Sequence, residues 1–261
     1  MQAFEYSGMK KHIQGVFYVT CCAVYLSYFY GMKVYFIPGL GADKRVFRHI
    51  SLPQTYEAVY LEWLKPEKKE SLENYSLRMS AQIQCDESFY VLGLSLGGMI
   101  AAEITRVFPQ SKLILIASIP HAGHLPVYYR WIQKARLQKV VPITVIKTFV
   151  YMRRYFTAET DVDKNLIRSM ARDADPFFIR WALNAALEWK GYDYLEDTIH
   201  IHGTNDVVLP VKYTRPTHVI MNGSHLMIMD RAEEINKILG EVMSIEVENR
   251  KSKIESEMES M

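Results

Sequence analysis

A serine, an aspartate and a histidine follow one another along this chain in local settings suited to acyl-transfer chemistry. Ser95 lies in a Gly-x-Ser-x-Gly run, between an apolar stretch and an Ala-rich helical pattern. This strand–turn–helix context is what a nucleophile elbow requires, because Gly93 and Gly97 leave room for a strained turn. The setting predicts a nucleophile at Ser95, and the alternative, a plain helix N-cap, leaves the flanking glycines unexplained.

The two partners that such a serine needs follow later predicted strands. His225 lies in the loop Asn-Gly-Ser-His-Leu, and Asp206 lies in His-Gly-Thr-Asn-Asp. We expect His225 to act as the base and Asp206 to orient it, because the carboxyl ends of parallel strands meet at one sheet edge. The alternatives are a turn-capping Asp206 and an ordinary surface histidine at position 225. His202 is expected to hold the acid loop rather than to catalyse.

The elements that must position these residues alternate between strands and helices. Continuous apolar or β-branched runs predict six strands, at 33–37, 56–61, 89–94, 112–117, 198–202 and 218–221. Helical spacing predicts elements within 42–50 and over 71–83, 96–108 and 232–242. Uninterrupted apolar strands that alternate with helices predict an α/β fold with a mostly parallel sheet covered on both faces. The block 120–195 is helical throughout, in the position of a lid over the carboxyl ends of the strands.

Together, these motifs make the chain similar to the α/β-hydrolase fold superfamily, in its compact esterase-like form. The motifs are Pro-Gly-Leu-Gly (38–41), Gly-x-Ser-x-Gly-Gly (93–98), His-Gly-x-x-Asp (202–206) and Gly-Ser-His (223–225). The order nucleophile, acid, base is the one found in this superfamily. The resemblance implies a cofactor-free serine hydrolase with a Ser95–Asp206–His225 triad.

The same resemblance implies an oxyanion hole built from the backbone N–H groups of Leu40 and Leu96. The sequence departs from the superfamily pattern at three points. Pro38 stands where a histidine is usual, which leaves the backbone donors in place. The first two strands of the usual sheet are missing, unless residues 13–30 supply one. The separation between acid and base, 225 − 206 = 19 residues, is short, and no rival carboxylate follows a predicted strand.

These observations divide the chain into four parts. Residues 32–119 and 196–243 form the α/β core, 120–195 form the helical lid, and 244–261 form a charged tail that is a frayed helix or disordered. Residues 1–31 stand outside the core. Their apolar and aromatic run is compatible with a signal peptide or anchor, with an extra strand, or with a natural start at Met32.

Composition excludes several other classes of protein. The 261 residues are 49% hydrophobic and 23% charged, with a formal net charge of +2, which gives no reason to expect a nucleic-acid partner. The three cysteines, Cys21, Cys22 and Cys85, form no disulfide framework, and no metal-ligand motif occurs. We therefore expect no cofactor and no metal, and a cytoplasmic location unless the N-terminal apolar segment anchors or exports the chain.

The sequence favours hydrolysis of a carboxylic ester with a small acyl group, which would be the small-molecule partner. A thioesterase, an acyltransferase and a C–C bond hydrolase would use the same triad, so these alternatives stay open. So does a slow hydrolase-like receptor, whose lid would respond to a ligand. His121 and His124 could line the mouth of a pocket, and Arg153 and Arg154 could meet an anionic substrate, although ordinary surface roles are favoured for all four.

Overall fold

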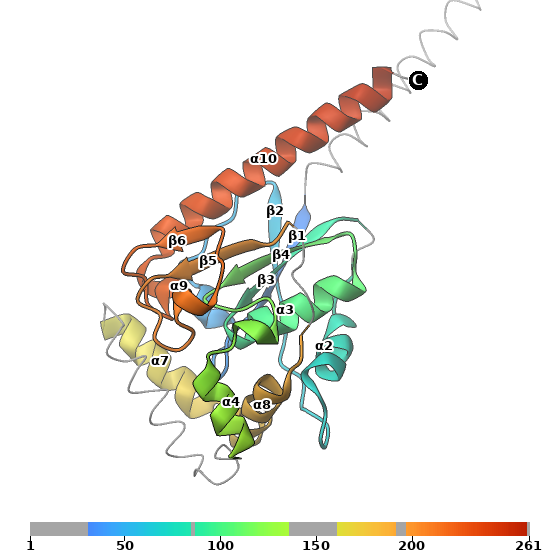
Figure 1. Cartoon of the computed structure of the whole chain (residues 1–261). Helices are drawn as coiled ribbons and strands as arrows, with labels where there is room; N and C mark the ends of the chain where they lie inside the picture. Colours follow the sequence, from blue (N-terminus) through green and yellow to red (C-terminus); the bar gives the residue numbers. More distant parts are fainter. Residues whose placement is uncertain (1–30, 85–86, 136–160, 192–196, 260–261) are drawn as a thin grey trace, which may run out of the picture.

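The computed structural model describes residues 31–84, 87–135, 161–191 and 197–259, and its centre is a parallel β-sheet (Figure 1). In this part of the chain six strands pair in the order β2-β1-β3-β4-β5-β6, all parallel. They are β1 (Met32–Ile37), β2 (Tyr56–Tyr60), β3 (Phe89–Leu94), β4 (Ser111–Ile116), β5 (Ile199–Gly203) and β6 (His218–Ile220). The prediction of an α/β fold with a parallel sheet is confirmed, and each strand begins and ends within one residue of its predicted bounds.

Helices and short 3-10 turns connect these strands. In chain order they are η1 (Lys44–Phe47), α2 (Leu72–Ser80), α3 (Leu96–Val107), η2 (Ala122–His124), α4 (Val127–Lys134), α7 (Asp161–Asp173), α8 (Pro176–Glu188), η3 (Val211–Tyr213), α9 (Met227–Asp230) and α10 (Ala232–Glu259). Their starts follow ordinary capping rules. The Ser71 hydroxyl accepts a hydrogen bond from the Asn74 amide, and Asp175 caps α8 just before Pro176.

The two faces of the sheet build two separate hydrophobic cores. On β1, Tyr35 and Ile37 face a core completed by α2, α3 and α8, whereas Val34 and Phe36 face one completed by η1, α7, α9 and α10. All four side chains are buried, as the period-two alternation of a strand covered on both faces requires. The sheet is therefore the middle layer of three layers (Figure 1).

The strand order reverses direction at the centre of the sheet. From β1 the chain passes first to β2 on one side and then to β3 on the other. The loops that leave β1 and β3 therefore diverge, which opens a crevice at the carboxyl ends of these two strands. Residues 38–41 follow β1 and residues 95–98 follow β3, so the fold brings two of the predicted motifs to the same carboxyl edge of the sheet.

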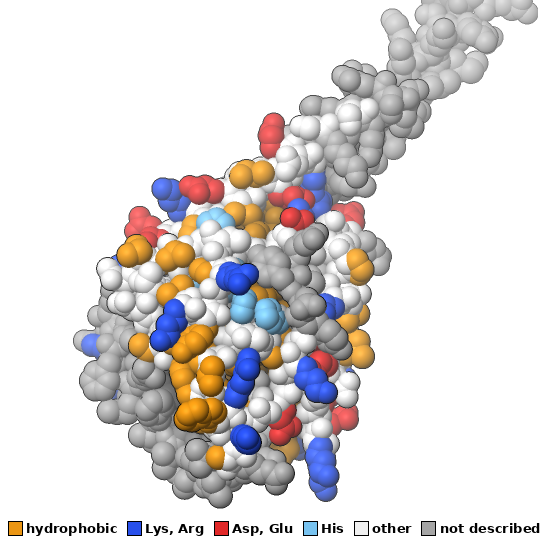
Figure 2. All heavy atoms as spheres, in the orientation of Figure 1, with side chains coloured by type: hydrophobic (Ala, Val, Ile, Leu, Met, Phe, Trp, Pro, Cys, Tyr) orange, Lys and Arg blue, Asp and Glu red, His pale blue; other side chains and the backbone are white. Residues whose placement is uncertain are grey.

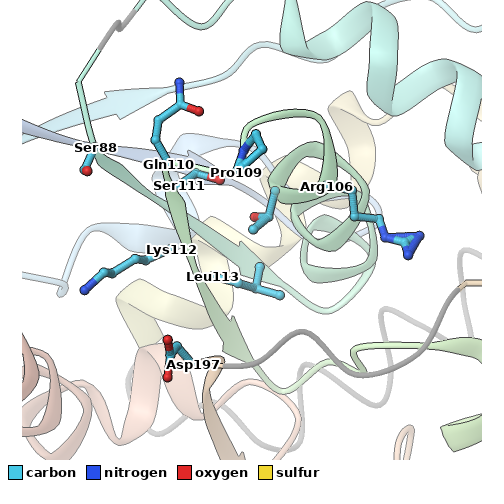
Figure 3. Close-up of a pocket in the computed structure, with 9 residues that line it drawn as sticks. Ser88, Arg106, Pro109, Gln110, Ser111, Lys112, Leu113 and Asp197 are labelled. Atoms are coloured by element: carbon cyan, nitrogen blue, oxygen red, sulfur yellow. The ribbon is translucent and has the colours of Figure 1, made fainter.

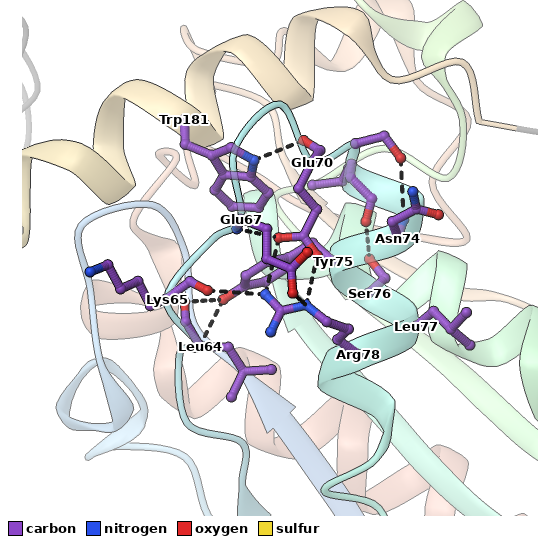
Figure 4. Close-up of polar contacts among 12 residues, drawn as sticks. Leu64, Lys65, Glu67, Glu70, Asn74, Tyr75, Ser76, Leu77, Arg78 and Trp181 are labelled. Atoms are coloured by element: carbon purple, nitrogen blue, oxygen red, sulfur yellow. Dashed lines mark hydrogen bonds and ion pairs between the residues drawn. The ribbon is translucent and has the colours of Figure 1, made fainter.

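The described part of the segment between β4 and β5 contains η2 and the helices α4, α7 and α8, joined by short non-helical stretches. Residues 136–160 and 192–196 lie outside the described part. Two tryptophan hydrogen bonds fix α8 to the core. Trp181 Nε1 donates to the Glu70 carbonyl oxygen at 2.9 Å, and Trp189 Nε1 donates to Glu103 Oε1 at 2.7 Å. Figure 4 shows the first of these beside the bidentate Arg78–Glu70 pair that ties the preceding loop to α2.

Hydrophobic side chains gather over α4 (Figure 2), where Val127, Tyr128 and Trp131 are exposed. The helix has a strongly one-sided distribution of apolar residues. It packs against α8, and Tyr129 Oη donates to the Val208 carbonyl oxygen at 3.0 Å. The division of the chain into core, lid and tail, and the role of the lid, stay predictions.

The last helix is longer than the sequence predicted. α10 does not end at Val242, and it continues through the expected charged tail to Glu259. Tertiary contacts support the extension, because Tyr56 Oη donates to the Met243 carbonyl oxygen at 3.0 Å and Lys112 forms an ion pair with Glu246. Arg250, one turn further on, donates to Glu246 at 3.2 Å. Of the charges in the expected tail, Glu246 and Arg250 thus make contacts that hold this part of the helix.

The three interpretations of residues 1–31 fall almost entirely outside the described residues, so they stay predictions. Among the helices that the structure does describe, none combines the length and the apolar character needed to cross a bilayer.

Candidate active site

Ser95 occupies a strained turn between β3 and α3. Its backbone has φ 52° and ψ −117°, a region that side-chain-bearing residues rarely adopt. The neighbouring glycines permit this turn. A Cβ at Gly93 would lie 2.3 Å from the Gly97 carbonyl oxygen, and a Cβ at Gly97 would lie 2.2 Å from that of Ile37. The predicted elbow geometry is therefore present at this position.

Two groups that the sequence did not single out hold the turn. The Ser118 hydroxyl, fully buried after β4, donates to the Ser95 carbonyl oxygen at 2.6 Å. The Ser95 amide in turn donates to the Ile116 carbonyl oxygen at 3.0 Å. Gly98 provides the space for Ser118, since a Cβ there would lie 2.3 Å from its hydroxyl. The second glycine of Gly97-Gly98 was the only sequence signal of this contact.

His225 joins Ser95 to Asp206. Its Nε2 lies 2.9 Å from Ser95 Oγ, and its Nδ1 lies 2.7 Å from Asp206 Oδ2. Because a buried carboxylate accepts, Nδ1 carries the proton and Nε2 is left to accept from the serine hydroxyl. The structure thus brings together the three side chains that the sequence predicted, from positions separated by as many as 130 residues.

The loops that carry the base and the acid are packed directly against each other. The Asn205 amide donates to the Gly223 carbonyl oxygen at 2.9 Å, and a Cβ at Gly203 would lie 2.1 Å from that same oxygen. Asn222 takes a left-handed backbone conformation with φ 60° just before the glycine. This close approach of two backbones explains how a separation of only 19 residues still places acid and base side by side.

The Asp206 carboxylate is buried and held in its ionised form. Burial by itself would raise its pKa, but the nearby His225 and the hydrogen bonds from His202, His225 and the Leu209 amide lower that pKa below its ordinary value. Oδ1 accepts from the Val208 and Leu209 amides at 2.9 and 2.8 Å. The carboxylate therefore presents Oδ2 to His225 in a fixed orientation.

The two predicted oxyanion donors come from the two chain segments that meet at Ser95. Leu96 is the first residue of α3, where amide groups have no carbonyl partner within the helix. Leu40 belongs to the loop after β1. This loop passes close to the elbow, since a Cβ at the adjacent Gly39 would lie 3.5 Å from the Ser95 Cβ. Their part in catalysis stays a prediction.

Solved structures of other proteins share this arrangement of strands and helices. No protein-family model matches the sequence. The structure of an esterase from Exiguobacterium antarcticum is similar with a TM-score of 0.62 at 17% identity, covering 80% of this chain and 91% of the other. A thermophilic esterase from Thermogutta terrifontis gives 0.60 at 16%, covering 82% and 90%. The chain has the α/β-hydrolase fold.

The sequence relatives of this chain include three uncharacterised mycobacterial proteins. Uncharacterised proteins from Mycobacterium tuberculosis and Mycobacterium bovis are each 26% identical over 236 residues, covering 77% of this chain and 69% of the relative. They add no information about substrate.

The α/β-hydrolase fold places a cavity of about 480 Å³ beside the loop that follows β1. Gly41 and Ala42 form one wall, and Trp63, Met170 and Phe178 supply much of the apolar lining. A second cavity, of about 630 Å³, lies at the opposite edge of the sheet near Arg106 and Lys112 (Figure 3). Of these two cavities, only the first lies at the carboxyl ends of the strands, where Ser95 follows β3.

The other polar residues considered from the sequence do not join Ser95 in the described structure. His121 caps η2 by accepting from the Gly123 amide at 3.1 Å, and its ring lies against that of His124 with centroids 4.1 Å apart and planes inclined by 44°. Burial lowers the pKa of His124 to about 4, with smaller effects from His121 and Arg215. Arg153, Arg154 and the three cysteines lie outside the described residues. Among the described residues, no group of three or more His, Cys, Asp or Glu side chains could hold a metal ion.

Proposed function

We propose that the protein is a serine hydrolase that acts on carboxylic esters with a small acyl group. One observation carries the proposal, the continuous hydrogen-bonded series from Ser95 Oγ through His225 to the buried Asp206 carboxylate. A serine hydroxyl is a weak nucleophile by itself, and a base within hydrogen-bond reach, oriented by a third group, activates it.

In the proposed reaction Ser95 Oγ attacks the acyl carbon and its proton passes to His225 Nε2. The negative charge that develops on the carbonyl oxygen is met by the Leu40 and Leu96 amides, which are backbone donors and need no movement at that moment. Collapse of the tetrahedral intermediate expels the alcohol, which takes the proton from His225. Water then attacks the acyl-enzyme with His225 again as base, releasing the acid and restoring Ser95.

Two further observations support an ester as the substrate. The lining of the cavity of about 480 Å³ is mainly apolar and includes Gly41, the residue after the proposed oxyanion donor Leu40, although Ser95 and His225 are not part of that lining. The two solved structures quoted above are those of esterases. Thioester hydrolysis, acyl transfer and C–C bond hydrolysis require the same three side chains, so a substrate panel decides among them. A small-molecule acyl compound is the proposed partner in each case.

A fluorophosphonate probe tests the nucleophile directly. We expect a single adduct on Ser95, identified by mass spectrometry of the digested protein. Ser95→Ala should abolish the adduct and lower the rate of ester hydrolysis by ~10⁴-fold or more. His225→Ala should slow labelling, whereas His218→Gln, which changes a histidine on β6 outside the site, should label like the unaltered protein. Absence of an adduct on Ser95, or unchanged labelling of His225→Ala, would refute the proposal.

A further inference from the structure

Two histidines lie behind the acid and take no part in the mechanism above. His200 and His202 are two residues apart on β5 and therefore point to the same face of the sheet. Both are fully buried. Polar side chains in such surroundings are costly unless they are hydrogen-bonded, so their contacts indicate what they do there.

His202 contacts the acid turn at two places. Its Nε2 lies 2.7 Å from the Leu209 carbonyl oxygen and 3.3 Å from Asp206 Oδ2. A carbonyl oxygen can only accept, so Nε2 carries a proton, which points at Leu209 and lies close to the carboxylate. The Leu209 amide meanwhile donates to Asp206 Oδ1 at 2.8 Å. His202 therefore secures the same peptide segment that holds the acid.

His200 determines which nitrogen of His202 carries the proton. Its Nε2 lies 3.0 Å from His202 Nδ1. With the His202 proton on Nε2 and pointing at Leu209, its Nδ1 is left to accept, and His200 Nε2 is the donor. Burial, reinforced by His202 and opposed by the Ser118 backbone, lowers the pKa of His200 to about 3, so His200 is neutral near pH 7. His200 Nδ1 makes no hydrogen bond with the described residues, which leaves Nε2 as the nitrogen with a polar partner. The hydrogen bond then disfavours the other tautomer of His202, which would lose its bond to Leu209.

The Oδ2 atom of Asp206 thus faces two imidazole rings. His225 donates to it at 2.7 Å, and the protonated edge of His202 lies 3.3 Å away. The negative charge on this oxygen is shared between the two rings, which reduces the part of it that can stabilise a protonated His225. A base that is to accept a proton from serine must be neutral at the working pH.

We propose that His202 and His200 are positioning residues, in which His202 holds the Asp206 turn and shares Oδ2 with His225, and His200 fixes the tautomer of His202 that can do so. This inference rests on the proposed function. The other titratable group that acts on His200 is His124 of η2, whose own pKa Arg215 influences. The base loop has one further acid, Asp230 of α9, whose carboxylate lies 3.4 Å from the Ser224 hydroxyl. All of them are unchanged in the variants below.

The first test uses the pH dependence of kcat/KM. In His202→Leu and His200→Leu the proton of His225 is held more strongly, so the acid limb of the profile should move to higher pH by roughly half a unit or more. His200→Gln keeps a side-chain N–H that can donate to His202 Nδ1, and its limb should stay with that of the unaltered protein. His218→Gln, on the neighbouring strand, is the matched control and should leave the limb in place.

The proposal is overturned if the leucine variants unfold normally on heating and the acid limb of their kcat/KM profile stays in place or moves to lower pH. The two histidines would then have a structural role only. If His202→Leu fails to fold, His200→Leu carries the test, because it does not touch Asp206.

The second test requires no activity and separates this inference from the proposed function. In protein labelled with 15N-histidine, NMR correlations between ring nitrogens and carbons should report the Nε2–H tautomer for both His200 and His202 near pH 7. In His200→Leu the His202 signals should lose this pure tautomer. A cationic His202 or an Nδ1–H tautomer in the unaltered protein would overturn the inference, whereas failure of the fluorophosphonate label alone would overturn only the proposed function.

Discussion

At the scale of single residues, the carboxylate of Asp206 governs the candidate site. It is buried, yet its pKa lies below the ordinary value, because the donors around it outweigh the cost of burying a charge. An ionised acid in a fixed orientation keeps the Nδ1 proton on His225, which leaves Nε2 free to accept from Ser95. An amide at position 206 would remove the charge and present a donor to His225 instead.

The rate of ester hydrolysis after replacement of Asp206 by asparagine tests this role of the carboxylate. We expect Asp206→Asn to lower kcat for ester hydrolysis by about 10³–10⁴-fold, because the imidazole would adopt the wrong tautomer. Steady-state kinetics on the best substrate of the ester panel measures this. Asp230→Asn, an acid near the base loop that bonds Ser224, is the matched control and should stay within a few-fold of the unaltered enzyme. Similar rates for the two variants would remove Asp206 from the mechanism.

Residues whose role depends on their place in a local motif could be predicted from the sequence. Ser95 has its glycines, and Asp206 and His225 follow strands, so each carries a signal in its own neighbours. Ser118 carries no such signal in its own neighbours, because its contact with the Ser95 carbonyl exists only after β3 and β4 have paired. His200 lies two residues from His202 on β5, so the period of a strand places both on one face. What the sequence does not indicate is that the acid turn packs against that face.

At the scale of elements, the elbow and the loop after β1 are packed so closely that only glycine fits between them. A Cβ at Gly97 would lie 2.2 and 2.4 Å from the carbonyl oxygens of Ile37 and Pro38. These are backbone atoms, which cannot move aside without displacing the strand end that carries them. The nucleophile turn and the loop with the proposed donor Leu40 are thus set against each other by one residue.

A methyl group at this position should disrupt both loops. We expect Gly97→Ala to destabilise the protein by about 1–3 kcal/mol, as overpacking of a close contact does, and to abolish labelling of Ser95. Urea unfolding and the fluorophosphonate assay measure the two effects. Gly240→Ala is the matched control, since a Cβ there meets nothing within 4 Å, and it should stabilise α10 by about 0.5–1 kcal/mol. Normal labelling of Gly97→Ala would contradict the role assigned to this contact.

The extent of the elements was predictable wherever burial decides it. The central strands β3 and β4 are buried almost throughout and appear in the sequence as largely apolar runs. The edge strands β2 and β6 are partly exposed, and their β-branched and aromatic residues mark them instead. The bounds of all six were predicted to within a residue. The end of α10 was not, because it depends on contacts of Met243 and Glu246 with Tyr56 and Lys112, far away in the sequence. Periodicity detects an apolar face, and the outer part of α10 is mainly polar.

At the scale of the whole molecule, two histidines, the buried His200 and the partly buried His124, make the free energy of unfolding depend on pH. Histidine titrates near pH 6.5 in an unfolded chain, whereas in the folded protein burial lowers the pKa of His200 to about 3 and that of His124 to about 4. Between the folded and the unfolded pKa of each histidine, the unfolded chain binds more protons than the folded protein does. The free energy of unfolding therefore decreases as the pH falls below about 6.5. The contribution of Asp206 is present above its unfolded pKa and is lost at still lower pH, as the pH falls toward the folded value.

The slope of stability against pH measures this coupling. Each such histidine contributes a slope of about 1.4 kcal/mol per pH unit in this window. His200→Gln removes one of them, so between pH 7 and 5 it should lose less stability than the unaltered protein, by up to about 2 kcal/mol. Urea unfolding at several pH values provides the comparison, with His218→Gln expected to follow the unaltered protein. A difference between His200→Gln and the unaltered protein that is constant with pH would contradict this account.

The neighbouring positions of β4 and β5 have a consequence for engineering. The two strands pair directly, with Ile116 beside Ile201, although the chain between them carries α4, α7 and α8. A segment that leaves and re-enters a rigid sheet at adjacent strands can be exchanged without altering the pairing of either. Ser95, Asp206 and His225 all lie outside it. Chimaeras that transplant this segment from other proteins of the same fold therefore test its predicted role as a lid, and under that prediction they should change selectivity while the reactive groups are retained.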